Sequence, residues 1–259
     1  MGERTKYTPG TFSWTDLATT DQDAAKQFYS RLFGWSAIDN PVGDGVVYSM
    51  MQIDGKDVAA ISPQPPQQRD AGAPPAWNSY VTVQSADDAA DRAQKLGATV
   101  HAPAFDVMDV GRMAVIQDPQ GAYFMAWEPK THIGASLVNA HGALAWNELA
   151  TPDMDASAEF YRELFGWKVE PMEGSPMPYM VIQNADGGSN GGIRPAQENE
   201  PTYWLVYFGA NDIDACLGQV GELGGNTLVG ATDIGMGKIG VVQDPQGAVF
   251  ALFSGQLDD

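Results

Sequence analysis

The sequence is poor in the residues that most often bind metals or form covalent links. Its 259 residues include one cysteine, Cys216, and three histidines, His101, His132 and His141. A single cysteine excludes an internal disulfide and a paired-thiolate metal site. No histidine lies near Cys216 in the sequence, so we interpret it as a small core residue on a helix. We interpret the three histidines as structural or exposed residues.

Basic residues are also scarce. Lysine and arginine number 14 against 33 aspartates and glutamates, which gives a formal net charge of −19. A polyanion would be repelled by this charge, and no basic patch is present to release counterions from phosphates. The composition therefore excludes nucleic acid and anionic membrane surfaces as expected partners. We interpret the acidic excess as a solvating surface.

Long hydrophobic runs are absent as well. No apolar stretch approaches the roughly 20 residues of a membrane-spanning helix. The opening letters MGERTKYTPGTFSW have no apolar core of the kind found in signal peptides. With 44% hydrophobic and 18% charged residues, the composition is that of a folded protein. The sequence thus predicts a cytoplasmic protein with two ordinary domains.

What the chain does have is a repeat. FYSRLFGW at residues 28–35 returns as FYRELFGW at residues 160–167. DPQGA at residues 118–122 returns unchanged at residues 244–248. Because the order of these blocks is kept, the halves are expected to be duplicates. The expected domains are residues 8–130 and 141–256, with the joint within residues 128–142.

A second repeat lies within each half, which reads strand, helix, three short strands, and then the same again. Alternating residues 12–18 predict a strand, and a helix follows from a cap at Thr20 or Asp21 to Gly34. The proline-rich residues 62–75 predict a linker before the second unit. This order predicts an α+β fold of four βαβββ modules, paired into two tandem domains with curved mixed sheets. One face of each sheet would be buried on its helices while the other lines a cleft.

These features together resemble the vicinal oxygen chelate superfamily, also called the glyoxalase/bleomycin-resistance/dioxygenase fold. The resemblance rests on FYxxLFGW after a first strand, DPxG before a last strand and the fourfold module, and it covers nearly the whole chain. More narrowly, WxDLxTTD, VAAIxPxPP and HIGAxLVN are similar to the two-domain actinobacterial type, typified by the mycobacterial 27 kDa antigen.

The resemblance implies where a metal would lie, because the superfamily's enzymes take their ligands from the first and last strands of each module. Those positions carry Trp14, Asn78 and Met125 in the first half, and Trp146, Leu205 and Ala251 in the second. A divalent metal needs imidazole, thiolate or carboxylate ligands, usually three or more. The residues present do not form that set, so we expect no bound metal and no cofactor.

The same positions predict what each cleft offers instead. Residues two apart on a strand share a face, so Asp16 should lie beside Trp14, and Glu148 beside Trp146. The expected ligand-binding residues are Trp14, Asp16, Asn78, Tyr80, Tyr123, Met125 and Trp127 in the first half, and Trp146, Glu148, Tyr207 and Phe253 in the second. Aromatic surface with a few polar groups is typical of a pocket for a flat organic molecule. Of the two clefts, the first has more of these aromatic and polar groups.

The leading hypothesis is a metal-free protein, monomer or homodimer, that binds an aromatic or amphiphilic metabolite or natural product. Its role would be sequestration, resistance, or support of a biosynthetic enzyme. A metal-independent isomerase, epimerase or hydrolase is the alternative, with Asp16 or Glu148 as general base. Two further readings stay open, namely a partner-binding or dimeric structural protein, and domains whose clefts are filled by their own side chains.

Overall fold

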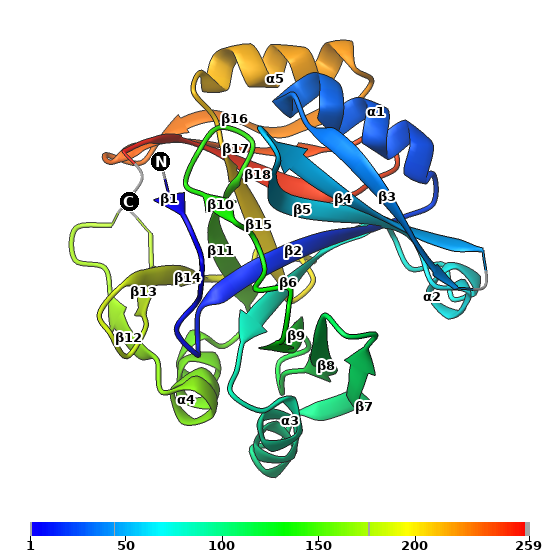
Figure 1. The fold of residues 1–259 in the computed structure, drawn as a ribbon. Coiled ribbons are helices and arrows are strands. Elements are labelled where there is room, and N and C mark those ends of the chain that lie inside the picture. Colours follow the sequence, from blue (N-terminus) through cyan, green and yellow to red (C-terminus); the bar gives the residue numbers. More distant parts are fainter. Residues whose placement is uncertain (1, 44, 176, 257–259) are drawn as a thin grey trace.

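The computed structural model describes residues 2–43, 45–175 and 177–256. Each half of the chain forms one mixed sheet of eight strands (Figure 1). The first half contributes β2 (Phe12–Thr19), β3 (Ser36–Gly43), β4 (Val46–Ile53), β5 (Lys56–Pro63), β6 (Ala76–Thr82), β7 (Thr99–Val107), β8 (Gly111–Gln117) and β9 (Tyr123–Pro129). The second half contributes β11 (Leu144–Thr151), β12 (Lys168–Pro171), β13 (Met180–Gln183), β14 (Ser189–Pro195), β15 (Tyr203–Gly209), β16 (Asn226–Asp233), β17 (Gly237–Gln243) and β18 (Val249–Gly255).

The strand order shows how two modules join into one sheet. Across the first sheet it is β3-β4-β5-β2-β6-β9-β8-β7, and across the second β12-β13-β14-β11-β15-β18-β17-β16. The first strand of each module pairs in parallel with its last, as in β2 with β5 and β6 with β9. The two first strands, β2 and β6, pair antiparallel at the centre. The α+β fold of four βαβββ modules is therefore confirmed.

Capping residues set the ends of the helices. The helices are α1 (Gln22–Phe33), α2 (Pro66–Asp70), α3 (Ala86–Lys95), α4 (Met154–Phe165) and α5 (Ile213–Glu222). Asp21 accepts a hydrogen bond from the Ala24 amide, and Gly34 ends α1 with a left-handed φ of 74°. Asp153 and Gly166 do the same for α4. None of the described helices is long and apolar enough to cross a membrane.

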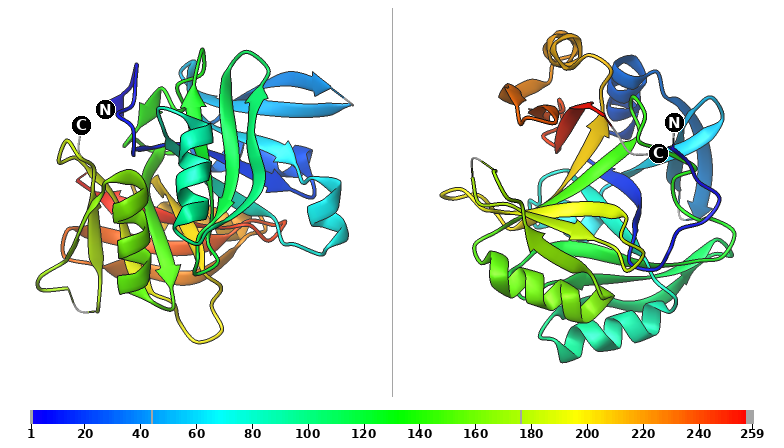
Figure 2. Two further views of the ribbon diagram at one scale, coloured as in Figure 1. Left: turned by 90° about the horizontal axis from the view of Figure 1, so that it is seen from below. Right: turned by 90° about the vertical axis from the view of Figure 1, so that its left-hand side faces the viewer.

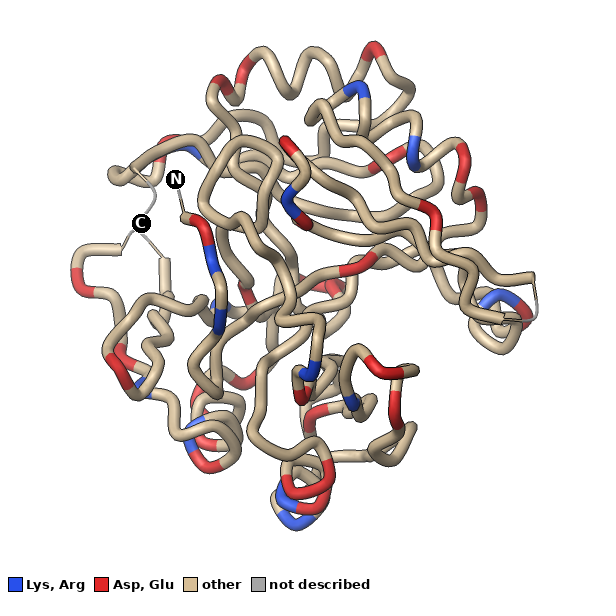
Figure 3. Tube along the Cα trace, in the orientation of Figure 1, with Lys and Arg blue, Asp and Glu red and all other residues tan. Residues whose placement is uncertain are grey.

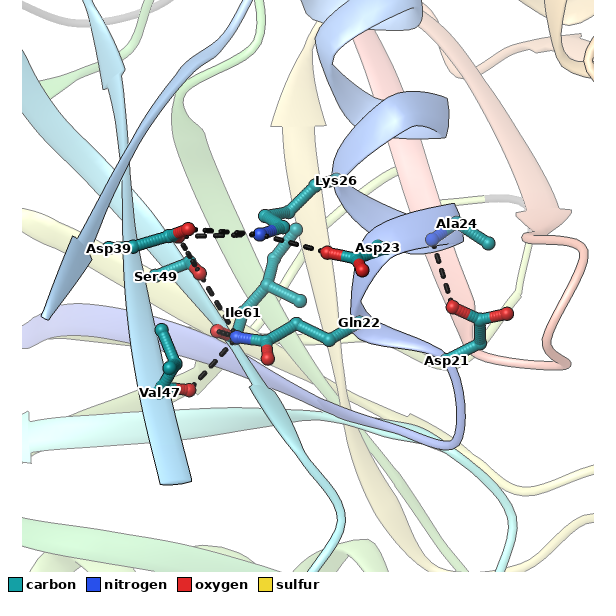
Figure 4. A network of polar contacts seen from close by, with 9 residues as sticks. All are labelled: Asp21, Gln22, Asp23, Ala24, Lys26, Asp39, Val47, Ser49 and Ile61. Atoms are coloured by element: carbon teal, nitrogen blue, oxygen red, sulfur yellow. Dashed lines mark hydrogen bonds and ion pairs between the residues drawn. The ribbon is translucent and has the colours of Figure 1, made fainter. Parts of the chain in front are cut away.

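Polar side chains fasten the start of α1 to its own sheet (Figure 4). The Gln22 amide donates to the carbonyl oxygens of Val47 and Ile61, so it joins β4 to β5. The Ser49 hydroxyl donates to Asp39 on β3, and Lys26 forms ion pairs with Asp39 and Asp23. These contacts fix the angle at which α1 leaves β2.

The helices pair across the two halves, so the cores are shared. Helix α1 lies against α5, and α3 lies against α4 (Figures 1 and 2). One hydrophobic cluster joins Phe28 and Trp77 to Phe208 and Phe250, and a second joins Phe124 to Trp204 and α4. Neither half therefore buries its helices with its own residues alone.

The repeated DPQG turns form the polar part of this shared interface. Asp118 accepts hydrogen bonds from the amides of its own turn and, through Oδ2, from the Tyr161 hydroxyl at 2.8 Å. Asp244 accepts in the same way from Tyr29 at 3.0 Å. Each tyrosine comes from the FY pair of the other half. The two repeated motifs thus contact each other across an approximate two-fold relation.

Two stretches expected to be loose are more ordered than the sequence suggested. The proline-rich segment contains the short helix α2, which begins after Pro65. The joint between the halves is the segment between β9 and β11, which we call the connector (residues 130–143). It contains β10 (Leu137–Val138), and β10 pairs with β1 (Gly2–Glu3). Leu137 and Val138 are buried in the first core cluster. The pairing of β1 with β10 joins residues about 135 positions apart, which local periodicity does not encode, whereas α2 is held by hydrogen bonds between near neighbours.

Alternation along the strands divides each sheet into two faces. The residues directed toward the helices, such as Leu17, Ile61 and Phe124, are fully buried. The opposite faces carry most of the residues expected at the site. The first inner face is Trp14, Asp16, Tyr48, Met50, Asn78, Tyr80, Met113, Val115, Met125 and Trp127, and the second inner face is Trp146, Glu148, Tyr203, Leu205, Tyr207, Ile239, Val241, Val249, Ala251 and Phe253.

Candidate functional site

Asp16 is the polar centre of the first inner face. Its carboxylate accepts hydrogen bonds from the Tyr80 hydroxyl at 2.6 Å, from the Asn78 amide at 2.8 Å and from the Tyr48 hydroxyl at 3.1 Å. The Trp14 indole nitrogen donates to the Tyr48 oxygen at 3.0 Å. Four of the side chains expected at the site are therefore brought together here, with Tyr48 as a fifth member.

Burial governs the protonation of this group. Desolvation raises the pKa of Asp16, although hydrogen bonds from Tyr80, Asn78 and Tyr48 act in the opposite direction. Burial and the Asp16 carboxylate together hold the pKa of Tyr48 and of Tyr80 well above the usual range. The two phenols therefore remain donors toward Asp16.

The connector covers one end of the first inner face. The His132 ring lies edge-on to Trp14, with ring centroids 4.6 Å apart, and also contacts Trp127. The Trp127 indole nitrogen donates to the His132 carbonyl oxygen at 3.0 Å. Trp14 and Trp127 are only 3% and 4% exposed. The expected residues are thus assembled, but the chain itself fills the space around them.

Glycine permits this close approach at Gly134, in the middle of the connector. Its φ is 110°, and a Cβ there would lie 2.4 Å from the Ser13 carbonyl oxygen. The next amide, of Ala135, donates to that same oxygen at 2.7 Å. The connector therefore lies directly on the start of β2.

The second inner face repeats the tryptophan–tyrosine contact. The Trp146 indole nitrogen donates to the Tyr179 hydroxyl at 3.0 Å, as Trp14 does to Tyr48. Gly192 on β14 makes room for that phenol, since a Cβ would lie 2.0 Å from the Tyr179 oxygen. Unlike Trp14, Trp146 is partly exposed, and so are Tyr203 and Phe253. The rest of this face is buried, with Leu205, Tyr207 and Ala251 at most 3% exposed.

Three charged side chains form the polar centre of the second inner face. Arg194 Nε donates to Glu148 at 2.8 Å, and its two terminal nitrogens bind both oxygens of Glu200. Their side chains are mostly buried, at 12% exposure for Arg194, 8% for Glu148 and 17% for Glu200. We call these three residues the charged triad. Tyr179 and Tyr207 also hydrogen-bond to Glu148, so the charged triad adds an arginine and a second acid to a tyrosine–acid arrangement like that around Asp16.

The carboxylates dominate the electrostatics around the charged triad. Burial and then Glu148 raise the pKa of Tyr207 and of Tyr179 far above the usual range. Burial and then Glu200 raise the pKa of Tyr203 to about 12, although Arg194 acts to lower it. Arg194 itself lowers the pKa of Glu200 through its hydrogen bonds. At each of these three phenols the raising effect of a carboxylate exceeds the lowering effect of Arg194.

Not every expected residue joins these centres. Tyr123 follows the inner-face alternation but is 46% exposed, and its ring lies against His101 at 4.9 Å. Two shallow surface hollows in the described part of the chain lie away from both inner faces. One is beside Lys26 and Arg31 on the outer side of α1, and the other is beside Asp212 and Asp233.

The residues at the family's metal positions do not fit a divalent metal. On the first inner face the single carboxylate, Asp16, is flanked by the indole of Trp14 and the thioether of Met125. Ala251 at the matching position of the second face offers no ligand. Within the described residues, no group of three or more histidine, cysteine, aspartate or glutamate side chains is placed to hold a metal.

Five polar residues of the site were missed from the sequence, namely Tyr48, Tyr179, Arg194, Glu200 and Tyr203. Tyr48 lies on β4 and Tyr179 just before β13, far in sequence from the acids that they approach. Arg194 lies on β14, and its partner Glu200 lies in the loop after that strand. The available signal was Arg194 itself. Basic residues are few in this chain, and this one lies two positions after a glycine, so on a strand the two share a face.

Comparison with known proteins supports the fold twice over. The model of the Glyoxalase/Bleomycin resistance protein/Dioxygenase superfamily matches residues 11–126 and again 143–252. A putative glyoxylase, CFP32, of Mycobacterium bovis is 43% identical over 97% of both chains. The anthracycline biosynthesis protein DauV of a Streptomyces species is 32% identical, over 96% of this chain and 94% of the relative.

Solved structures agree on the fold at much lower identity. A Mn(II)-bound glyoxalase from Novosphingobium aromaticivorans has a TM-score of 0.66 at 15% identity, covering 95% of this chain and 82% of that one. The 2,3-dioxygenase LapB from a Pseudomonas species has a TM-score of 0.65 at 16% identity, covering 98% and 96%. At this identity the likeness extends to the fold alone.

Proposed function

The chain belongs to the Glyoxalase/Bleomycin resistance protein/Dioxygenase superfamily, and we propose that it is a metal-free binding protein for an aromatic or amphiphilic small molecule. The observation that carries the proposal is the exchange of side chains at the family's metal positions. Aromatic and aliphatic groups stand there, and they continue along the strands as one apolar surface on each inner face. Such a surface favours flat organic ligands through contact area and ring stacking.

The second inner face is the better candidate for direct binding. Trp146, Tyr203 and Phe253 are partly exposed there, although Leu205, Tyr207 and Ala251 between them are buried, so a planar molecule has an aromatic edge to contact. On the first inner face, a ligand would have to separate Trp14 and Trp127 from the His132 ring. From the sequence, the first cleft was expected to offer more aromatic and polar groups than the second. The contacts of its tryptophans with His132 are what close it.

Two relatives support a link to aromatic natural products. DauV and DnrV, both described as anthracycline biosynthesis proteins, match nearly the whole chain at 32% and 31% identity. We propose a polycyclic aromatic metabolite as the ligand class, with sequestration, resistance or support of a biosynthetic enzyme as the role.

The contacts of the two acids weigh against the enzyme alternative. A general base needs a lone pair directed at the substrate. Asp16 already accepts three hydrogen bonds, and Glu148 is bound to Arg194. Most acceptor positions of Asp16 and one oxygen of Glu148 are therefore already engaged within the protein.

The test is a titration with a panel of aromatic metabolites, including anthracyclines, followed by tryptophan fluorescence and by thermal shift. We expect saturable quenching that Trp146→Phe weakens strongly. Trp14→Phe is the matched control, because its indole occupies the corresponding position of the covered face. A panel with no binder would overturn the proposal, and equal effects of the two variants would overturn the assignment to the second face.

A further inference from the structure

We infer that the second inner face selects aromatic ligands that carry a positive charge. The inference rests on the proposed function, since it names the class of molecule that the same face takes. Its basis is the charged triad, in which one guanidinium faces two carboxylates. A surplus of one negative charge remains at the base of an aromatic surface.

The neighbouring charges do not cancel this surplus. On β12, Lys168 and Glu170 form an ion pair at 2.9 Å, and Lys238 pairs with Asp214 at 3.2 Å. Both pairs are neutral as a whole. Beyond them the acidic residues outnumber the basic ones over the whole surface (Figure 3). The long-range field of the protein thus has the same sign as the local surplus.

The surplus negative charge lies where water screens it only weakly. The carboxylates of Glu148 and Glu200 are mostly shielded from water, so their field is screened less than that of a surface acid. Burial is the largest cause of the raised pKa of Tyr203 and Tyr207, and the next is the negative charge of Glu200 for Tyr203 and of Glu148 for Tyr207. A bound cation would be stabilised by this negative charge, and a bound anion destabilised.

Aromatic rings supply the second part of the recognition. The Tyr203 hydroxyl donates to Glu200 at 3.2 Å, and Trp146 lies two residues before Glu148 on β11. Both rings are partly exposed, as is Phe253 on the same inner face. The face of each ring attracts a cation, and tryptophan attracts it most. An aromatic body with an amino group would therefore gain ring stacking from its apolar part and electrostatic attraction from its charge. A carboxylate ligand would have to displace Glu200 from Arg194, where Glu200 holds both terminal nitrogens.

Three naphthalene probes of the same shape test the inference on the full chain. They are 1-naphthylmethylammonium, 1-naphthylmethanol and 1-naphthylacetate, titrated by calorimetry in low and in high salt. We expect the cation to bind about ten-fold more tightly than the alcohol in low salt, and the anion more weakly than both. High salt should reduce the differences in affinity among the three probes.

Two variants locate the charge. Glu200→Gln removes the surplus and should bring the cation and the alcohol to similar affinity. Glu198→Gln, an exposed position in the same loop, is the matched control and should leave the order unchanged. Because Glu200→Gln could disturb Arg194, quenching of Trp146 by caesium and iodide provides a second readout. Caesium should quench more than iodide in the wild type, and this bias should shrink in Glu200→Gln.

The outcomes separate the two proposals. Equal affinity for the cation and the alcohol, or tighter binding of the anion, would overturn the charge selection while leaving aromatic binding intact. Failure of all three probes, together with a metabolite panel that yields no binder, would overturn the proposed function as well.

Discussion

The two inner faces are built from the same repeated pattern, yet they differ in what surrounds them. Both place a tryptophan and an acid two residues apart on a central strand, with tyrosine hydroxyls beside the acid. The first face surrounds its acid with uncharged donors and is covered at one end by the connector. The second uses an arginine with two acids and stays partly exposed. The difference shows that the path of the chain between duplicated halves can leave equivalent tryptophans unequally exposed, with Trp14 buried and Trp146 partly exposed.

The largest expected effect comes from removing the cation of the second face. Arg194→Gln leaves the buried Glu148 without its ionic partner, so we expect a loss of about 3 kcal/mol in the free energy of unfolding. Urea denaturation followed by circular dichroism measures it. Arg112→Gln is the control, because Arg112 forms its ion pairs with Asp87 and Asp106 at the surface. Equal losses in the two variants would show that the charged triad is no more shielded than a surface pair.

The next test displaces the connector, so that the tryptophans of the first inner face become exposed as Trp146 is on the second. Gly134→Ala introduces a Cβ against the Ser13 carbonyl at a left-handed φ, at a cost of about 2 kcal/mol. The connector should lift, and Trp14 and Trp127 should become accessible to acrylamide. Gly174→Ala, which also has positive φ but open space around it, is the matched control. If Gly134→Ala is destabilised as expected but quenching stays at the wild-type level, the connector is not what covers the first face.

A smaller effect on the free energy of unfolding is expected from Asp16 as the pH changes. The pKa of Asp16 is raised in the folded protein, so between the ordinary aspartate pKa and this raised value the folded state binds more protons than the unfolded state. The contribution of Asp16 to stability therefore falls as the pH rises through that window. Asp16→Asn should cost about 1 kcal/mol at low pH, where the protonated acid is lost, and less at neutral pH. Urea unfolding of both proteins at several pH values measures the difference, and a cost that grows with pH would contradict the assignment.

The smallest expected effect on stability, with a clear optical signal, is at Trp146. It is the one tryptophan of the seven that is not buried. Trp146→Phe should change the free energy of unfolding by less than about 1 kcal/mol while removing most of the acrylamide-quenchable fluorescence. Trp14→Phe should leave the quenchable fraction in place. A quenchable fraction that survives Trp146→Phe would place the exposed indole elsewhere.

Local signals in the sequence were enough for the frame of the fold. The cap Asp21 and the stop Gly34 bracket α1, and strand alternation assigned Trp14 and Asp16 to one face. Duplication then carried the same assignment to the second half. These features depend on neighbours a few residues away, which is why they could be read directly.

The contacts that define the candidate site were harder to foresee. Tyr48 reaches Asp16 from a strand on the other side of β5, and Arg194 meets Glu200 through a loop. The connector lies on Trp14 although no period in its sequence indicates a strand or a helix. The tyrosine–aspartate contacts between FY and DPQG join opposite halves. Each depends on how the modules are placed in space, which the motifs alone do not state.

The most direct test of the central claim is a crystal structure of the protein soaked with the tightest-binding naphthyl probe. The account predicts the ring system against Trp146, Tyr203 and Phe253 on the second inner face, with the first inner face still covered by the connector. A probe seated beside Trp14 and Asp16, with His132 displaced, would contradict it.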